Sequence, residues 1–147
     1  MKALSMNAVY GLRALMYIAA QREQEGYVSI RKISEDLDIS FHFLTKILQT
    51  LTQHHILHSQ RGPAGGVALD KAPEQVTLLE MLYILEGEGY FSGCFMGLPG
   101  CGEQQPCPVH DFWRQITLTM KEKFSHTTLA ELSDKVRSGE VRLVSCT

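Results

Sequence analysis

The stretch SIRKISEDLDISFHFLTKILQTLTQHHILHSQRGPAGG, residues 29–66, decides the fold of this chain. Its apolar residues recur every three or four positions in two successive runs, which is the spacing of two amphipathic helices. Ser29 and Ser40 stand where helix N-caps are preferred, and Asp38–Ile39 supplies a short break between the helices. Two such helices joined by a tight turn predict a helix-turn-helix. The inward stripe of its second helix is expected at Phe41, Leu44, Leu48 and Leu51.

A β-hairpin is predicted directly after these helices. The extended segments 56–61 and 67–70 flank a Gly-Pro-Ala-Gly-Gly tip, which is typical of two strands joined by a tight turn. A hairpin in this position is a wing. We therefore expect a mainly α protein, a winged helix-turn-helix DNA-binding domain with a long C-terminal dimerisation helix.

The expected DNA-binding residues lie on the outward face of the second helix and along the wing. The helix offers side chains of the lengths that reach base edges and phosphates in a major groove. Arg61 stands at the base of the wing, where a guanidinium can enter a minor groove. For the helix alone an ordinary solvated face is the better interpretation, but its position before a wing favours DNA. The candidates are Ser40, His42, Thr45, Lys46, Gln49, Arg61, Gly62, Gly65 and Gly66.

Charge and hydropathy limit the other classes of protein. The formal charge is −2, with +2 over residues 1–72 and −4 over residues 73–147, so a DNA-facing surface is expected in the first half. No apolar run approaches the ~20 residues that span a bilayer, and the first 20 residues lack the pattern of a signal peptide. The chain is expected to be cytoplasmic, with no membrane partner.

A cysteine-rich loop is predicted in the middle of the chain. Thr77-Leu78-Leu79-Glu80 has the form of a capping box and opens a helix that runs to about Leu85. Residues 87–107, the cysteine loop, then hold six of the twelve glycines, two prolines and three of the four cysteines. A structureless loop of roughly 20 residues is unusual in a compact domain and is often functional.

A long helix is expected to follow the cysteine loop, with Pro108 in its first turn. Its large apolar residues form one stripe, which we interpret as a dimer interface; packing back onto its own domain is the alternative. The stripe contains Val109, Trp113, Ile116, Met120 and Phe124. The expected organisation is a DNA-binding domain at 1–86, the cysteine loop at 87–107, a dimerisation helix and short final helix at 108–137, and a flexible tail at 138–147.

The spacing Cys94-x6-Cys101-x5-Cys107-x2-His110 predicts a metal site. If Cys107 caps the long helix, His110 lies one turn further on and both side chains face the same point. Sulfur and nitrogen donors suit zinc or an iron–sulfur cluster, although the tight Cys-x2–4-Cys pair of most zinc sites is absent. A thiol switch that forms a disulfide is a further alternative. No orienting group accompanies a Cys–His pair, so we expect no enzyme.

The chain resembles the Rrf-two family of bacterial regulators over roughly residues 1–137. The resemblance rests on Tyr10-Gly11-Leu12-Arg13-Ala14-Leu15 in the first helix and on the wing signature Arg61-Gly62-Pro63-Ala64-Gly65-Gly66, with Ala64 where glycine is more usual. It also rests on Cys94, Cys101 and Cys107-Pro108-Val109-His110 in the cluster loop.

This resemblance implies a homodimeric transcription regulator, expected to be a repressor, that binds a pseudo-palindromic operator in double-stranded DNA. It implies a [2Fe-2S] cluster held by Cys94, Cys101, Cys107 and His110, with [4Fe-4S] as the alternative. Some members take a ligand from an acidic residue in the first helix, but here the stretch reads Asn7-Ala8-Val9. Others tune their DNA choice with an acidic residue at the position of Thr45. Iron–sulfur status, redox state and nitric oxide are the signals that the resemblance suggests.

Overall fold

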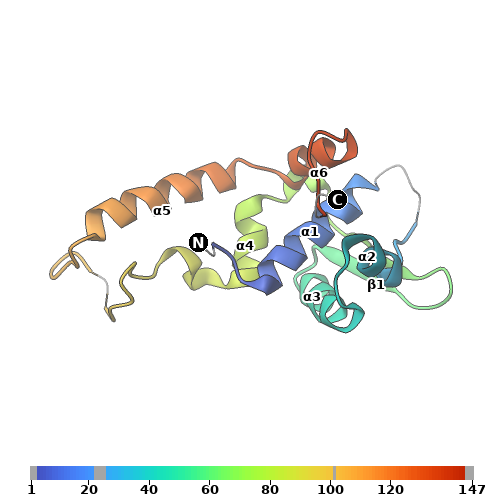
Figure 1. Cartoon of the computed structure of the whole chain (residues 1–147), viewed down its shortest axis with the longest axis horizontal. Coiled ribbons are helices and arrows are strands. Elements are labelled where there is room, and N and C mark those ends of the chain that lie inside the picture. Colours follow the sequence, from blue (N-terminus) through green and yellow to red (C-terminus); the bar gives the residue numbers. More distant parts are fainter. Residues whose placement is uncertain (1–2, 22–25, 101, 145–147) are drawn as a thin grey trace.

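The structure, a computed structural model, describes residues 3–21, 26–100 and 102–144. Within these described ranges, six α-helices, two short 3-10 helices and one two-stranded sheet follow one another (Figure 1). In order they are α1 (Met6–Ala20), α2 (Ile30–Leu37), α3 (Phe41–Gln53), β1 (Leu57–Gln60), β2 (Gly66–Leu69), η1 (Pro73–Gln75), α4 (Leu78–Glu86), η2 (Glu88–Phe91), α5 (His110–Ser125) and α6 (Leu129–Arg137). The winged helix-turn-helix is confirmed.

Helices α1 to α4, the wing and α6 form a head around one hydrophobic core. Leu12 and Leu15 of α1 are buried in this core, as are Ile33 and Leu37 of α2. The inward stripe of α3 differs from the prediction at one end. Ile47 is buried, whereas Phe41 is 43% exposed, because the buried face of α3 is centred between Leu44 and Leu51.

The turn between α2 and α3 depends on two residues. Asp38 adopts the left-handed conformation at φ 52°, which ends α2 and redirects the chain towards the Ser40 N-cap. Arg13 of α1 donates from its guanidinium to the Leu37 carbonyl oxygen over 2.9 Å, satisfying an acceptor at the end of α2. The end of α2, from which the chain turns into α3, is therefore held against α1.

The wing is a two-stranded antiparallel hairpin in which Leu57 pairs with Leu69 and Gln60 with Gly66. The chain before α2 adds a pair of backbone hydrogen bonds, because Val28 and Val67 each donate to the other's carbonyl oxygen, over 2.8 and 2.9 Å. The turn-side half of the wing is thus tied to the helix-turn-helix. Neither strand pattern nor turn chemistry in the sequence indicated this contact. Arg61 directly follows Gln60, so it lies beside the turn and not at the base of the wing, where it was expected.

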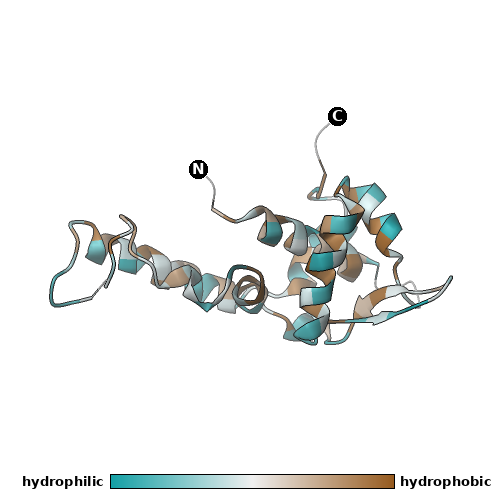
Figure 2. Ribbon diagram, turned by 90° about the horizontal axis from the view of Figure 1, so that it is seen from below, coloured by the Kyte–Doolittle hydropathy of each residue, from teal (hydrophilic) through white to brown (hydrophobic). Residues whose placement is uncertain are grey.

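Beyond α4 the chain leaves the head as an arm made of the cysteine loop and α5 (Figures 1 and 2). It returns to the head at the start of α4, the opposite end of that helix from its point of departure. The Leu78 N–H donates to the Thr127 carbonyl oxygen and the Leu129 N–H to the Val76 carbonyl oxygen, each over 2.8 Å. The returning end of the arm is therefore fastened to the head by backbone hydrogen bonds.

Helix α6 packs against α1 and buries Leu129 and Ala130, so the head includes residues far beyond position 86. Leu143 also packs on this core, and its carbonyl oxygen accepts a hydrogen bond from Arg13 Nε over 2.7 Å. The expected flexible tail is corrected to this extent: its segment up to residue 144 includes a packed residue. Among the helices described, none has the length and hydropathy that a membrane span needs.

Candidate DNA interface and cysteine loop

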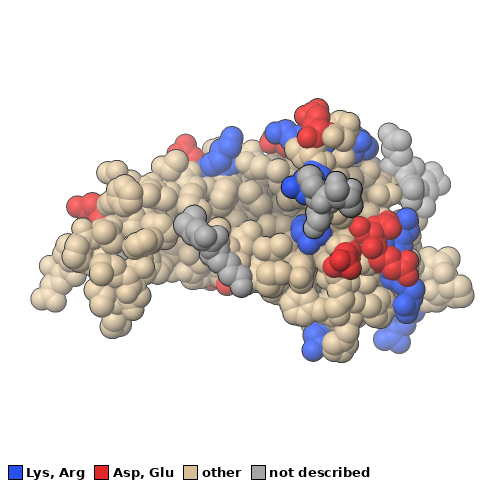
Figure 3. All heavy atoms as spheres, viewed as in Figure 1, with Lys and Arg blue, Asp and Glu red and all other residues tan. Residues whose placement is uncertain are grey.

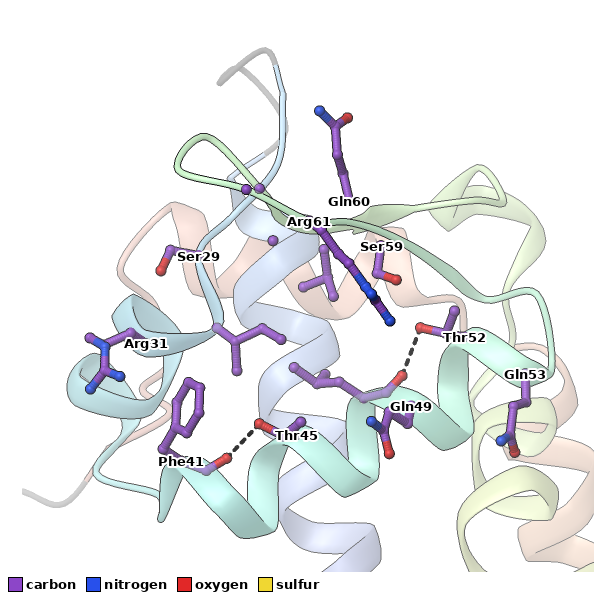
Figure 4. A pocket seen from close by; sticks show the side chains of 16 residues that line it. Ser29, Arg31, Phe41, Thr45, Gln49, Thr52, Gln53, Ser59, Gln60 and Arg61 are labelled. Atoms are coloured by element: carbon purple, nitrogen blue, oxygen red, sulfur yellow. Dashed lines mark hydrogen bonds between the residues drawn. The ribbon is translucent and has the colours of Figure 1, made fainter.

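A groove of about 550 Å³ lies between α3 and the wing (Figure 4). The helix-turn-helix supplies one wall, and the wing lies across from it because Val28 ties the hairpin to the start of α2. Six of the predicted DNA-binding residues line this groove: Thr45, Gln49, Arg61, Gly62, Gly65 and Gly66. Arg61 reaches from the wing towards α3 (Figure 4).

The other predicted DNA-binding residues do not line the groove. His42 and Lys46 are exposed on α3, and Ser40 is the N-cap of that helix, where its hydroxyl accepts from the Phe43 N–H over 3.5 Å. Ser40 therefore has a structural role that needs no DNA. The groove contains further polar or aromatic residues that the sequence did not single out: Ser29, Arg31, Phe41, Thr52, Gln53, Ser59 and Gln60.

The glycines of the wing serve its geometry. A Cβ on Gly66 would lie 2.1 Å from the Val28 carbonyl oxygen, and one on Gly65 would lie 2.2 Å from the Gln60 carbonyl oxygen. Gly62 has φ 108°, a conformation that side chains disfavour. Ala64 is not among the positive-φ residues, which explains why alanine fits where the family signature more often has glycine.

Charged side chains gather over the head on the face shown in Figure 3, whereas the outer part of the arm is largely uncharged there. Arg31 and Arg61 line the groove itself, and no carboxylate is among the described residues that line it. A groove with two cations and several hydrogen-bonding side chains suits a polyanion with readable edges.

The cysteine loop brings two of its thiols together. Cys94 Sγ and Cys107 Sγ lie 3.6 Å apart, well beyond the ~2.05 Å of a disulfide bond. Two sulfurs that share a tetrahedral metal with bonds of about 2.3 Å are separated by about 3.8 Å. The distance between the two sulfurs is therefore close to that of two thiolates bound to one metal ion, whether zinc or an iron of a cluster. Among the residues that the structure describes, no group of three or more metal-binding side chains is assembled. Cys101 lies outside those residues.

The start of α5 corrects the sequence prediction. The helix begins at His110 with Val109 as its N-cap, not at Pro108 with Cys107 as its cap. Cys107 instead accepts a backbone hydrogen bond from the His110 N–H over 3.1 Å, so a turn separates the thiol from the helix. His110 still lies within the same short segment, although the argument from a shared helix face no longer applies.

A second cavity of about 300 Å³ adjoins His110, between the cysteine loop and α5. Glu103 and Arg114 line it and form an ion pair. The hydrogen bond from the Arg114 guanidinium holds the pKa of the Glu103 carboxyl below its usual value, and the same bond raises the pKa of Arg114. This pair was not predicted, since residues 11 apart in a loop and a helix show no periodic relationship.

Only part of the apolar stripe on α5 is available to a partner. Trp113 donates to the Gly93 carbonyl oxygen over 3.1 Å, and the Phe124 ring lies 6.0 Å from that of Phe91. These contacts lie within one chain and correct the expectation of a stripe wholly between chains. Ile116 and Met120 instead border a shallow apolar hollow that is completed by Phe112, Gln115 and Thr119. Phe112 is 67% exposed.

Solved structures of known regulators share this architecture. CymR, the global cysteine regulator of B. subtilis, is similar with a TM-score of 0.77 and 26% identity, over 91% of this chain and 98% of that one. IscR of T. potens shares the fold with a TM-score of 0.74 and 20% identity, over 97% of this chain and 93% of that one. The head therefore has the winged-helix fold of these proteins.

Sequence relatives agree with this likeness. The transcriptional regulator IscR of Sodalis glossinidius is 28% identical over 129 residues, 88% of this chain and 77% of the relative. IscR of Erwinia tasmaniensis is 27% identical over 95% of this chain and 88% of its own. The model of the Rrf2 family, described as an iron-dependent transcriptional regulator, matches residues 4–135. With the match covering most of its length, the chain belongs to the Rrf2 family of transcriptional regulators, the Rrf-two family whose motifs it carries.

Proposed function

We propose that this protein is a homodimeric repressor that binds a pseudo-palindromic operator and senses iron–sulfur or redox status through its cysteine loop. The observation that carries the proposal is the 3.6 Å separation of Cys94 Sγ and Cys107 Sγ, on an arm that joins two points of a DNA-binding head. Family membership supports transcription regulation and DNA binding.

On the DNA side, α3 enters a major groove, and the wing lies over the neighbouring backbone or minor groove. Thr45 and Gln49 face the groove between α3 and the wing, where they are best placed to meet bases. His42 is a candidate for a further base contact, and Lys46 and Arg61 for phosphate or minor-groove contacts. Pairing two heads through α5 supplies the symmetry that a pseudo-palindrome requires.

On the sensing side, Cys94, Cys101, Cys107 and His110 are the proposed ligands of a [2Fe-2S] cluster, with [4Fe-4S] as the alternative. The cluster, when bound, supplies a centre that iron limitation, oxidants or nitric oxide can alter. The residues of the chain hold it between the cysteine loop and the start of α5. Three thiolates and one imidazole give the four protein ligands that the smaller cluster needs.

The arm provides the route from the sensor to the head. Trp113 connects α5 to Gly93, next to Cys94, and Phe124 packs on Phe91 at the exit from the head. The backbone bonds at Leu78 and Leu129 then anchor the returning end of the arm beside the start of α4. A rearrangement of the cysteine loop would therefore shift α5, and with it the spacing of two paired heads.

Anaerobic purification tests this proposal. We expect a coloured protein with visible absorption, stoichiometric iron and acid-labile sulfide, and an operator affinity that changes when the cluster is removed. A colourless protein that contains zinc would support a zinc-stabilised regulator without a sensing cluster. Cys101→Ala should abolish the colour, because Cys101 is a proposed ligand. Cys146→Ala should leave the colour unchanged, because Cys146 is not.

A thiol switch is the second candidate, and the same two sulfurs favour it. Cys94 and Cys107 need to approach by only about 1.6 Å to form a disulfide, and the similar CymR is a cysteine regulator. Oxidised glutathione would take up the two electrons and two protons as two molecules of reduced glutathione. A disulfide in metal-free protein that alters DNA affinity, absent in Cys94→Ser, would support this candidate.

A further inference from the structure

The first residue of α3 presents an aromatic ring to the groove between α3 and the wing. Phe41 opens α3, lines the groove between that helix and the wing, and is 43% exposed (Figure 4). It does not belong to the buried stripe of α3, so packing of the core does not account for an aromatic residue here. A large apolar side chain in a groove that also contains arginines suggests a ligand with both apolar and anionic parts.

Thr45, one turn further along α3, extends this apolar surface. Its hydroxyl donates to the Phe41 carbonyl oxygen over 2.7 Å (Figure 4). Because the hydroxyl proton is bonded to the backbone, Thr45 offers the groove a methyl group and an acceptor oxygen. In this conformation Thr45 does not donate a hydrogen bond to a base.

Arg31 completes the site. Its guanidinium carbon lies 4.8 Å from the centroid of the Phe41 ring, within the range of a cation–π contact. Arg31 is the second residue of α2, so this contact holds the positive charge beside the first turn of α3. Arg61 lies on the wing side of the same groove. The apolar spot is therefore accompanied by a cation on each side of the groove.

We propose that Phe41 and the Thr45 methyl group read the 5-methyl group of a thymine in the major groove, and that Arg31, stacked on Phe41, binds a neighbouring phosphate. The thymine methyl is the one apolar group that a base exposes in the major groove, and Phe and Thr methyl are side chains that contact it. The inference rests on the proposed DNA binding. It adds a specificity element and gives Arg31 a role.

The test begins with an operator obtained by selection from random double-stranded DNA. Each thymine of that operator is then replaced, one at a time, by deoxyuracil, which removes only the methyl group. For the parent protein we expect one position per half-site where this change weakens binding about fourfold, the effect of withdrawing one methyl group from an apolar contact.

Variants assign the effect to these residues. Phe41→Ala and Thr45→Ser should bind the thymine and deoxyuracil operators equally, whereas Thr45→Val, which keeps the methyl group, should still discriminate. Phe43→Ala is the matched control, since Phe43 is also exposed on α3 but packs on Tyr10 and does not line the groove. Arg31→Ala should weaken both operators alike and lower the salt slope of binding by about one.

Each outcome decides between the two proposals. Failure to select any bound sequence would overturn both DNA binding and this inference. An operator bound equally with thymine and deoxyuracil at every position, or a Phe41→Ala protein with the parent's discrimination, would overturn only the thymine contact. Thermal unfolding of each variant identifies any that has failed to fold. If Phe41→Ala has failed, the thymine contact is decided by Thr45→Ser, which keeps the hydroxyl group and loses only the methyl group.

Discussion

The indole N–H of Trp113 donates a hydrogen bond to the carbonyl oxygen of Gly93, 3.1 Å away, and so joins α5 to the residue before Cys94. The Phe95 ring packs on the same indole, with 5.0 Å between centroids. The two sides of the arm are thus connected next to the proposed sensing site, by the single tryptophan of the chain. Five predictions follow from this arm and from the groove.

Replacement of Trp113 by Phe should loosen the cysteine loop while preserving most of the apolar contact. The lost hydrogen bond should lower the free energy of unfolding by about 0.5–1.5 kcal/mol. We expect faster decay of the visible absorbance in air. Thr119→Val is the control, since that hydroxyl bonds only to its own helix at Gln115. Equal decay rates in both variants would mean that the Trp113 bond does not restrain the loop.

His110→Ala should retain the cluster about tenfold less well on exposure to air, because one of four ligands is lost. His110→Cys should keep a cluster of lower reduction potential, since a thiolate donates more charge than an imidazole. Visible spectroscopy and protein-film voltammetry measure both effects. His126→Ala, at the other end of α5, should match the parent. A parental spectrum and stability in His110→Ala would place the fourth ligand elsewhere.

Arg61→Ala should weaken operator binding at least about tenfold, because the guanidinium that reaches into the groove supplies charge next to the DNA backbone or minor groove. Dimerisation and cluster content should not change. Gel shifts at fixed salt measure the affinity, with Arg137→Ala on α6 as the charge-matched control. Identical affinities for the two variants would remove Arg61 from the interface.

Gly66→Ala should disturb the wing, because its Cβ would collide with the Val28 carbonyl oxygen. We expect loss of operator binding together with a lower midpoint of thermal unfolding. Ala64→Gly is the control at the tip, where alanine already fits, and should cost no more than about 1 kcal/mol through the entropy of the unfolded chain. Normal DNA affinity in Gly66→Ala would show that the wing tolerates displacement from Val28.

Phe112→Glu and Ile116→Glu should each yield monomers in sedimentation experiments, because a charge would be buried in the apolar hollow of α5. Leu118→Glu tests the specificity of this face. Leu118 is 54% exposed on the same helix but does not border the hollow, so this variant should stay dimeric. Dimers in all three variants would mean that another surface pairs the chains.

Periodicity predicted most of the head from the sequence. The two helices of the helix-turn-helix and the capping residues Ser29, Ser40 and Thr77 lie where they were expected. Phe41 was assigned to the inward stripe of α3, which is wrong, since the residue is exposed. Its spacing of three from Leu44 also fits a residue at the edge of a buried face. The start of α5 was wrong by two residues, since the preference for proline in a first turn does not exclude a turn before the helix.

The contacts between distant parts of the chain could not be predicted. No local pattern indicates that Val28 bonds to the wing, that α6 covers α1 or that Arg13 donates to Leu143. Cys94 and Cys107 were grouped by spacing, and their Sγ separation depends on how the loop folds back on itself. Cys101 and Cys146 lie outside the described residues, and the ligand roles of Cys94, Cys101, Cys107 and His110 all stay predictions.

Thr77 and Thr128 form a backbone bridge with one another, and the segment between them comprises the arm and α4, whose Met81, Leu82 and Leu85 are buried in the head. The arm beyond α4 can change in sequence without altering the groove at α3, because neither the cysteine loop nor α5 contributes a residue to the lining of that groove. The head could then keep its operator while acquiring a different sensor, or keep its sensor while the recognition helix diverges. Evolution within such a fold can vary the signal and the target independently.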